Sequence, residues 1–245
     1  MNAKEYLSNP MGKGSSILML NEARRILDSQ YEKIVSKITL KWYSYSSNHL
    51  VAHVKIPSRS AEGLMYDVLL EFNLSSVPEN ITTIDKASLR VFSNCPSFTY
   101  TYANIFDKQG DLINWTKTKY SKKIFELDPK IRNPHQIRSY ERSLYFAIKY
   151  ITSNGRNYKH KIDYNHIKVD GWSNILNKVE DAESVVKLYK IKKAVVDDRK
   201  SKETAKPKTN TSQPLRHKNT KGYTKTTANT KKTKKTSSTK KMKKL

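Results

Sequence analysis

Residues 39–56 read TLKWYSYSSNHLVAHVKI, and this stretch decides the fold class that the sequence predicts. Apolar and polar residues alternate over 39–45 and again over 50–56, which is the two-residue period of a half-buried strand. The segment SSNH between them is typical of a turn. The stretch therefore predicts two neighbouring antiparallel strands.

Three more segments with the same period follow along the chain. MYDVLLEFNL at 65–74 places Tyr66, Val68, Leu70, Phe72 and Leu74 on one face of a strand. SLRVFS at 88–93 and FTYTYANIF at 98–106 are further strand candidates. Four to five strands in sequence with short connections predict an antiparallel β-meander.

Helical periodicity lies on both sides of these strands. Apolar residues recur every three or four positions over 17–38, which predicts an amphipathic helix that covers one face of the sheet. A second helix is expected over 137–155, because Gly155 stands just past the last periodic residue. A final long helix is expected over about 172–198, with acidic residues first and basic residues last, as the helix dipole favours.

The predicted fold class is α+β: an antiparallel β-meander of four to five strands with an N-terminal helix and C-terminal helices, followed by a disordered basic tail. The predicted boundaries are a flexible lead over 1–15, a globular domain over 16–198 and a tail over 199–245. The tail has only six apolar residues, which are too few to offset the entropy lost on ordering it.

Positive charge is concentrated at the C-terminal end. Residues 199–245 hold seventeen Lys or Arg residues and one acidic residue, Glu203, so they carry about +16 of the formal +25. Such asymmetry indicates a tail that binds a polyanion, either nucleic acid or an anionic surface. The lysines have no apolar face between them, which argues against a membrane helix.

The tail lysines are the main predicted nucleic-acid-binding residues, since flexible lysines suit contact with phosphate in any sequence. They are Lys231, Lys232, Lys234, Lys235, Lys240, Lys241, Lys243 and Lys244. The alternative is that the tail only keeps the protein soluble.

A second predicted binding site lies in the body of the chain. Its residues are Lys117, Lys119, Lys122, Lys123, Arg156, Lys159 and Lys161. Phe98, Tyr100 and Tyr102 share one face of a candidate strand near these lysines, and bases could stack on them. A row of aromatic residues on one strand face is also typical of core packing.

No residue pattern in the chain predicts catalysis, a metal site or a cofactor. The single cysteine, Cys95, has no histidine near it in sequence, and the six histidines match no zinc pattern. The carboxylate pair Asp107 and Asp111 could bind magnesium in a nuclease, but it flanks a glycine-containing turn that Asp favours anyway. We therefore expect a protein that is not an enzyme.

No run of residues is long and apolar enough to span a bilayer, and the N-terminus does not read as a signal peptide. The expected location is the cytoplasm, and the alternatives are association with the nucleoid or a place within a virion. No membrane partner is expected. Protein partners or a homo-oligomer stay open.

The order of elements resembles the ubiquitin-conjugating-enzyme-like and RWD architecture over about 17–152. GDLINW at 110–115, followed by PHQIRSYERSLYFAIKYI at 134–151, is similar to the family's stretch from the catalytic cysteine to the next helix. The chain departs from the family at the nucleophile, because no cysteine lies near Leu112 or Ile113. The resemblance therefore implies a binding version without conjugating activity.

The expected function is non-enzymatic, largely sequence-independent binding of nucleic acid, with the tail on phosphates and the folded domain positioning it or binding a partner. The alternative is a structural, scaffold or virion-associated protein of a phage or mobile element, whose globular domain binds another protein. The sequence does not separate DNA from RNA.

Overall fold

The computed structural model describes residues 1–10, 16–76, 84–126, 133, 138–152 and 167–204. Its centre is a five-stranded sheet in the order β4-β3-β2-β1-β5. The strands are β1 (Thr39–Ser46), β2 (His49–Pro57), β3 (Met65–Asn73), β4 (Ser88–Ser93) and β5 (Lys168–Val169). Neighbours from β1 to β4 are antiparallel, while β5 runs parallel to β1. The α+β meander expected from the sequence is confirmed.

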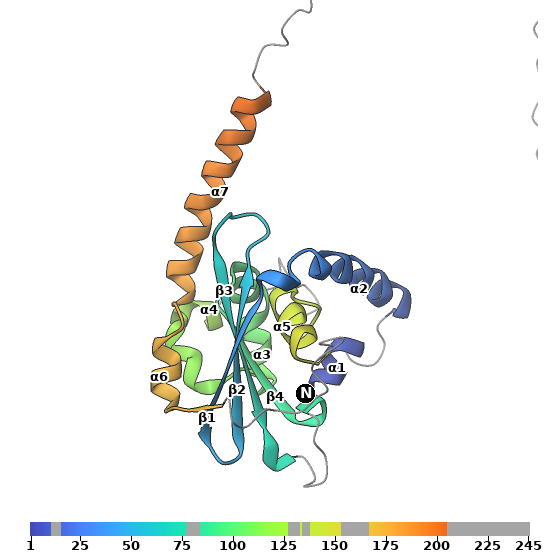
Figure 1. Cartoon of the computed structure of the whole chain (residues 1–245), viewed down its shortest axis with the longest axis vertical. Coiled ribbons are helices and arrows are strands. Elements are labelled where there is room, and N and C mark those ends of the chain that lie inside the picture. The colour runs from blue at the N-terminus through green and yellow to red at the C-terminus, as the bar shows by residue number, and fades with distance from the viewer. Residues whose placement is uncertain (11–15, 77–83, 127–132, 134–137, 153–166, 205–245) are drawn as a thin grey trace, which may run out of the picture. The chain divides into compact units, whose positions relative to one another are not determined.

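Helices lie on both sides of this sheet (Figure 1). The α-helices are α1 (Ala3–Ser8), α2 (Ile17–Glu32), α3 (Ala103–Lys108), α4 (Lys122–Glu126), α5 (Arg142–Thr152), α6 (Trp172–Asn177) and α7 (Ala182–Thr204). Short 3-10 turns are η1 (Val35–Lys37), η2 (Leu74–Ser76), η3 (Ile84–Lys86) and η5 (Asn114–Lys119), and η4 (Phe98–Tyr102) is a π-helical turn.

One face of the sheet is the apolar face expected from the period of β3. Val68, Leu70 and Phe72 have no exposed surface, and they lie beside Val54, Ala52 and Leu50 of β2. Helices α1, α2 and α5 lie on this side of the sheet (Figure 1). Burial of such side chains is the main stabilising term, at about 1.5–3 kcal/mol for each large one.

The other face of the sheet is buried as well, although its residues alternate apolar and charged types. Leu69 and Phe92 pack there, and Asp67, Glu71 and His53 are buried among them. Tyr120 packs on Phe92 with ring centroids 5.1 Å apart. The cover on this side comes from η5, α6 and the segment that joins α6 to α7. Trp115 of η5 contacts Glu71, and Glu180 of the joining segment contacts Asp67. The sequence pattern alone does not predict this second layer.

Residues 98–106 do not form the predicted strand. They fold as η4 and α3, and Phe98 packs on Phe106 with centroids 5.4 Å apart. Pro96 stands in the first helical turn, where its fixed φ favours a helix. Apolar spacing of four and eight residues from Phe98 to Tyr102 and Phe106 suits a helix as well as a strand. The sheet instead gains its fifth strand from β5.

The predicted single helix over about 172–198 is also corrected. It is two helices, α6 and α7, and α7 continues to Thr204. The break occurs because Asp181 caps α7, accepting a hydrogen bond from Ser184 N–H at 2.8 Å. At the same point the Glu180 N–H and C=O bond to Asp67 and Asn94 of the sheet region.

The flexible lead expected over 1–15 is wrong for residues 1–10. Asn2 and Glu5 form a capping box at α1, and Tyr6 is wholly buried with its hydroxyl donating to Ser139 O at 3.0 Å. The Met1 ammonium lies 2.8 Å from Asp111 Oδ1. Residues 11–15 lie outside the described residues.

Residues 1–205 form one compact unit, and 206–245 a second unit that lies outside the described residues. The predicted disorder of the tail therefore stays a prediction. Within the described ranges, no helix combines the length and apolar character that a bilayer crossing requires.

Candidate nucleic-acid interface

Four of the predicted phosphate-binding lysines lie on the turn of chain formed by η5 and α4. Buried residues anchor this segment: Thr116 Oγ1 donates to Ile113 O at 2.6 Å, and Tyr120 OH donates to Ser93 O at 2.7 Å. Because these anchors face inward, the residues between them face outward. Lys117, Lys122 and Lys123 are exposed, and Lys119 is partly exposed.

Two of these lysines are near carboxylates. Lys117 Nζ lies 2.6 Å from Asp107 Oδ1, with 44% of the lysine side chain exposed. Lys119 lies close enough to Asp181 for its charge to help lower the pKa of that carboxyl, although the hydrogen bond from Ser184 is the larger cause. The four lysines are therefore a weaker source of positive potential than their number indicates.

An aromatic cluster, defined as Tyr45, His49, Trp115 and Trp172, lies at the β1 side of the sheet. Tyr45 stacks on His49 with centroids 5.1 Å apart, and Trp115 meets Tyr45 edge-on at 6.2 Å. Trp172 lies 6.5 Å from Trp115 and is 49% exposed. Three separate segments, the β1–β2 hairpin, η5 and α6, supply these rings.

Glu71 fixes the inner part of the aromatic cluster. Its Oε1 accepts hydrogen bonds from the Trp115 indole N–H at 2.9 Å and from the Tyr45 hydroxyl. Burial, and then the bond to Glu71, raise the pKa of Tyr45, so this hydroxyl stays protonated as a donor. Glu71 itself is only 3% exposed. Trp172 is thus the outer ring of a cluster whose inner rings are fixed by hydrogen bonds to Glu71.

The surroundings of the cluster are basic and apolar. Arg90 lies across from Glu71 in the β3–β4 pair, is exposed, and acts electrostatically on Tyr45. Val169 of β5 is 90% exposed, and Lys168 beside it is exposed too. An exposed ring beside cationic side chains is the arrangement on which unpaired bases stack while phosphates meet positive charge.

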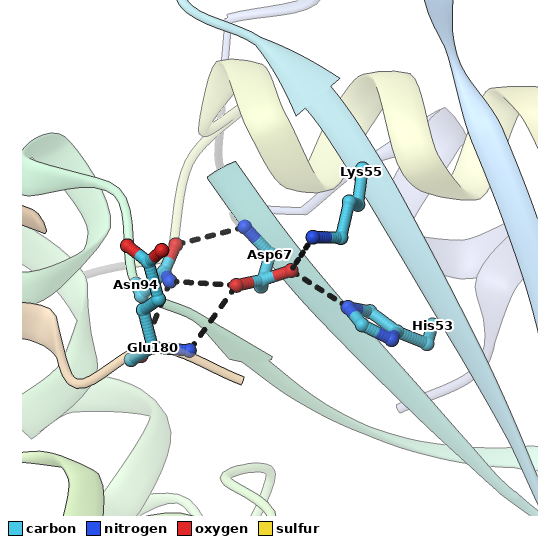
Figure 2. A network of polar contacts seen from close by, with 5 residues as sticks. All are labelled: His53, Lys55, Asp67, Asn94 and Glu180. Atoms are coloured by element: carbon cyan, nitrogen blue, oxygen red, sulfur yellow. Dashed lines mark hydrogen bonds and ion pairs between the residues drawn. The ribbon is translucent and has the colours of Figure 1, made fainter. Parts of the chain in front are cut away.

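A buried polar network sets the position of α6 and its Trp172 (Figure 2). Asp67 Oδ1 lies 2.7 Å from His53 Nε2 and 3.6 Å from Lys55 Nζ. Its Oδ2 accepts from Asn94 Nδ2 at 3.2 Å and from Glu180 N–H at 3.3 Å. The network therefore ties β2, β3 and the end of β4 to the chain between α6 and α7.

Asp67 is ionised in this network. Burial by itself raises the pKa of Asp67, but the hydrogen bond and charge of His53, together with Lys55 and Glu180 N–H, hold it below its ordinary value. A second tie fixes the start of α6, where Asp170 N–H donates to Ser44 O of β1 at 3.0 Å.

The aromatic residues proposed from the sequence for stacking are not the ones that the structure exposes. Phe98 has no exposed surface, and Tyr100 and Tyr102 pack against the core. The core-packing alternative therefore holds for that segment. The exposed ring, Trp172, has no sequence signal of its own, because its neighbours Trp115 and Tyr45 are distant in the chain.

Several predicted site residues lie outside the described residues. They are Arg156, Lys159, Lys161, Lys231, Lys232, Lys234, Lys235, Lys240, Lys241, Lys243 and Lys244. Their role as phosphate contacts stays a prediction.

The candidate catalytic groups are engaged in other contacts. Asp107 pairs with Lys117, and Asp111 pairs with the Met1 ammonium and with Arg138 at 2.5 Å. Among the residues the structure describes, no group of three His, Cys, Asp or Glu side chains could hold a metal ion. Cys95 is 3% exposed, and burial together with the charge of Glu141 raises the pKa of its thiol, so it is a poor nucleophile.

Comparisons with protein-family models, curated proteins and solved structures give no match for this chain. The resemblance to the ubiquitin-conjugating-enzyme-like architecture therefore stays a prediction. Leu112 and Ile113, the positions near which that resemblance would place a nucleophile, are 1% and 0% exposed.

Proposed function

We propose that this protein binds nucleic acid without catalysis and largely without sequence preference. The observation that carries the proposal is the distribution of charge: residues 206–245, beyond α7, hold fourteen Lys or Arg residues and no acidic residue. Contact between flexible lysines and phosphates releases counterions, and this supplies affinity for any sequence. The folded domain positions the tail.

The aromatic cluster adds a preference for unpaired bases in this proposal. A base that stacks on the exposed face of Trp172 gains about 1–3 kcal/mol regardless of its identity. Lys168 lies on β5 beside β1, Arg90 lies on β4 opposite Glu71, and both supply positive charge for the phosphates of the nucleic acid. The cluster thus gives the folded domain a site of modest affinity, in addition to the larger contribution of the tail.

Direct titration tests the proposed function. We expect full-length protein to bind single-stranded DNA and RNA oligonucleotides of equal length with similar affinity in fluorescence anisotropy, since phosphate contacts carry no sequence information. Failure to bind either at 50 mM salt would contradict the proposal.

The aromatic cluster has its own prediction. Trp172→Ala should weaken binding of a single-stranded oligothymidine by about 1–3 kcal/mol, while Trp172→Phe keeps a stacking ring and most of the affinity. Neither variant should alter thermal stability much, because half of the Trp172 surface is already exposed. Equal affinity of the two variants would exclude Trp172 from the interface.

The alternative function is structural, with the globular domain binding another protein in a scaffold or virion. The observation that favours it is a row of apolar side chains on α7, where Leu188, Ile191 and Val195 are 39%, 61% and 46% exposed. Their spacing of three and four residues places them along one side of the helix. A protein partner that remains after nuclease treatment, and that Ile191→Ser releases, would favour this alternative.

A further inference from the structure

A cavity of about 290 Å³ opens where the loop after β2 faces the first turn of α5. The loop contributes Ser58, Arg59 and Ser60, and α5 contributes Arg142. Tyr189 of α7 lines it as well. This volume is near the lower end for small-molecule pockets, so the cavity suits a small ligand or one chemical group of a larger one.

Arg142 is a partly buried cation, and no acidic residue in the described ranges pairs with it. Its Nε donates to Gln30 Oε1 and its Nη1 to Pro57 O, both at 3.3 Å, and its guanidinium stacks on Phe146 at 4.7 Å. In the described part of the chain, no carboxylate lies within ion-pair distance of it. Buried charges are normally paired, so a cation in this setting indicates a missing anion.

Arg59 adds a second positive charge to the same cavity. It is exposed on the loop, and its charge acts on Arg142. Burial lowers the pKa of Arg142 below its ordinary value, Glu141 opposes this, and Arg59 adds to it. Two like charges at one cavity are unfavourable unless an anion lies between them.

Glu141 lines the cavity but already accepts three hydrogen bonds. They come from the Cys95 thiol at 3.2 Å, the Ser143 hydroxyl at 2.5 Å and the Leu144 N–H at 2.9 Å. Its carboxylate is thus held on the core side and makes no ion pair with Arg142. The cavity retains the charge of two arginines against this one carboxylate.

Hydroxyl groups complete the lining. Ser58 and Tyr66 oxygens lie 2.9 Å apart, and Ser60 and Tyr189 oxygens lie 3.1 Å apart. In each pair one hydroxyl donates to the other, so one proton is left for a ligand. Guanidinium forks with hydroxyl donors are the groups that recognise phosphate oxygens.

We propose that this cavity binds a phosphate group, with Arg142 and Arg59 pairing its oxygens and the Ser60–Tyr189 hydroxyls donating to it. The ligand is a phosphomonoester, either a small molecule or the terminal phosphate of a nucleic-acid strand. The inference does not rest on the proposed function, since it uses neither the tail nor the aromatic cluster.

Thermal unfolding of the full chain in inorganic phosphate, against chloride at equal ionic strength, tests the proposal. A ligand that binds only the folded state raises the melting temperature in a saturable way. We expect such a rise in the wild type and its loss in Arg59→Gln. Because Arg59 is exposed and makes no hydrogen bond or ion pair among the described residues, this variant should fold normally. Arg142→Lys should reduce the rise, because lysine keeps the charge but loses the fork.

Arg25→Gln is the matched control, since Arg25 is an exposed arginine on α2 outside the cavity. It should keep the full phosphate effect. A wild type without a phosphate-specific rise, or an equal rise in Arg59→Gln and wild type, would overturn the proposal and leave only weak surface binding. Oligonucleotides with and without a 5′-phosphate separate the two sources. A preference for the phosphorylated strand that Arg59→Gln removes supports a strand terminus, and equal binding supports a small phosphomonoester.

Discussion

Asp67 is the residue on which the packing of the second sheet face depends most. Its carboxylate contacts His53, Asn94 and the Glu180 N–H at the same time, and the residue is 4% exposed. Removing one partner of a buried charged pair leaves the other groups without compensation. We predict that Asp67→Ala lowers the free energy of unfolding by about 3–5 kcal/mol in urea titrations at pH 7.

The matched control for this variant is Asp170→Ala. Asp170 also accepts an amide N–H, from Asn174, and pairs with a lysine, Lys178, but the pair is open to solvent. Asp170→Ala should lower the free energy of unfolding much less than Asp67→Ala does. Equal losses in the two variants would show that the buried network has no special role.

The network also predicts a pH dependence with a definite sign. Because the pKa of Asp67 is lower in the folded chain than its ordinary value of 3.8, folding favours the ionised form. Its contribution is therefore complete above about pH 4 and is lost as pH falls through the folded pKa. The difference in unfolding free energy between wild type and Asp67→Asn should shrink below pH 4, whereas a constant difference from pH 7 to pH 3 would contradict this assignment.

Single residues show why one face of the sheet is predictable and the other is not. Val68, Leu70 and Phe72 are apolar at every second position of the strand, so their burial follows from the sequence. The intervening positions hold Asp67, Leu69 and Glu71, and a charge at such a position normally faces solvent. Their burial depends on Glu180 and Trp115, more than forty residues away, and no local pattern indicates such partners.

Among the elements, the break between α6 and α7 places Trp172 beside the sheet. Asp181 begins α7 by accepting the Ser184 N–H. We predict that Asp181→Ala costs about 1 kcal/mol of unfolding free energy, while Asp181→Asn, which can still cap, costs much less. Circular dichroism during urea unfolding measures both. No difference between the two variants would contradict the capping role.

Helices and strands differ in how much the sequence reveals of them. Strands β1 to β4 and helices α2 and α5 were predictable from periods of two and of three to four. Residues 98–106 fit the period of a strand as well as that of a helix, and Pro96, whose fixed φ suits a first helical turn, favours the helix. Strand β5 has two residues, Lys168 and Val169, too few for any period, and it exists through pairing with Tyr43 and Ser44.

For the whole molecule, the part of the candidate site that follows from sequence is its charge. The positions of lysines are read directly from the sequence, so the lysines of the tail and of η5 and α4 could be predicted as binding residues without knowledge of the fold. The aromatic cluster could not, because it forms only when β1, η5 and α6 meet. The cavity lined by Arg142 and Arg59 could not be predicted either, since its lining comes from five separate segments.

The central claim is that tail lysines supply most of the affinity for nucleic acid. The direct measurement is the slope of log affinity against log salt for the full chain and for a variant with eight tail lysines changed to glutamine. These are Lys231, Lys232, Lys234, Lys235, Lys240, Lys241, Lys243 and Lys244. A second variant, with Lys117, Lys119, Lys122 and Lys123 changed to glutamine, is the control within the folded domain.

If all eight tail lysines meet phosphates, the slope should fall by about six to seven units, since each contributes about 0.7–0.9. The control variant should change it less, because it removes half as many charges and Lys117 already pairs with Asp107. The account predicts weaker binding by the eight-lysine variant, with a residual salt dependence from the six basic residues that remain in 206–245. Unchanged affinity and slope in that variant would contradict it.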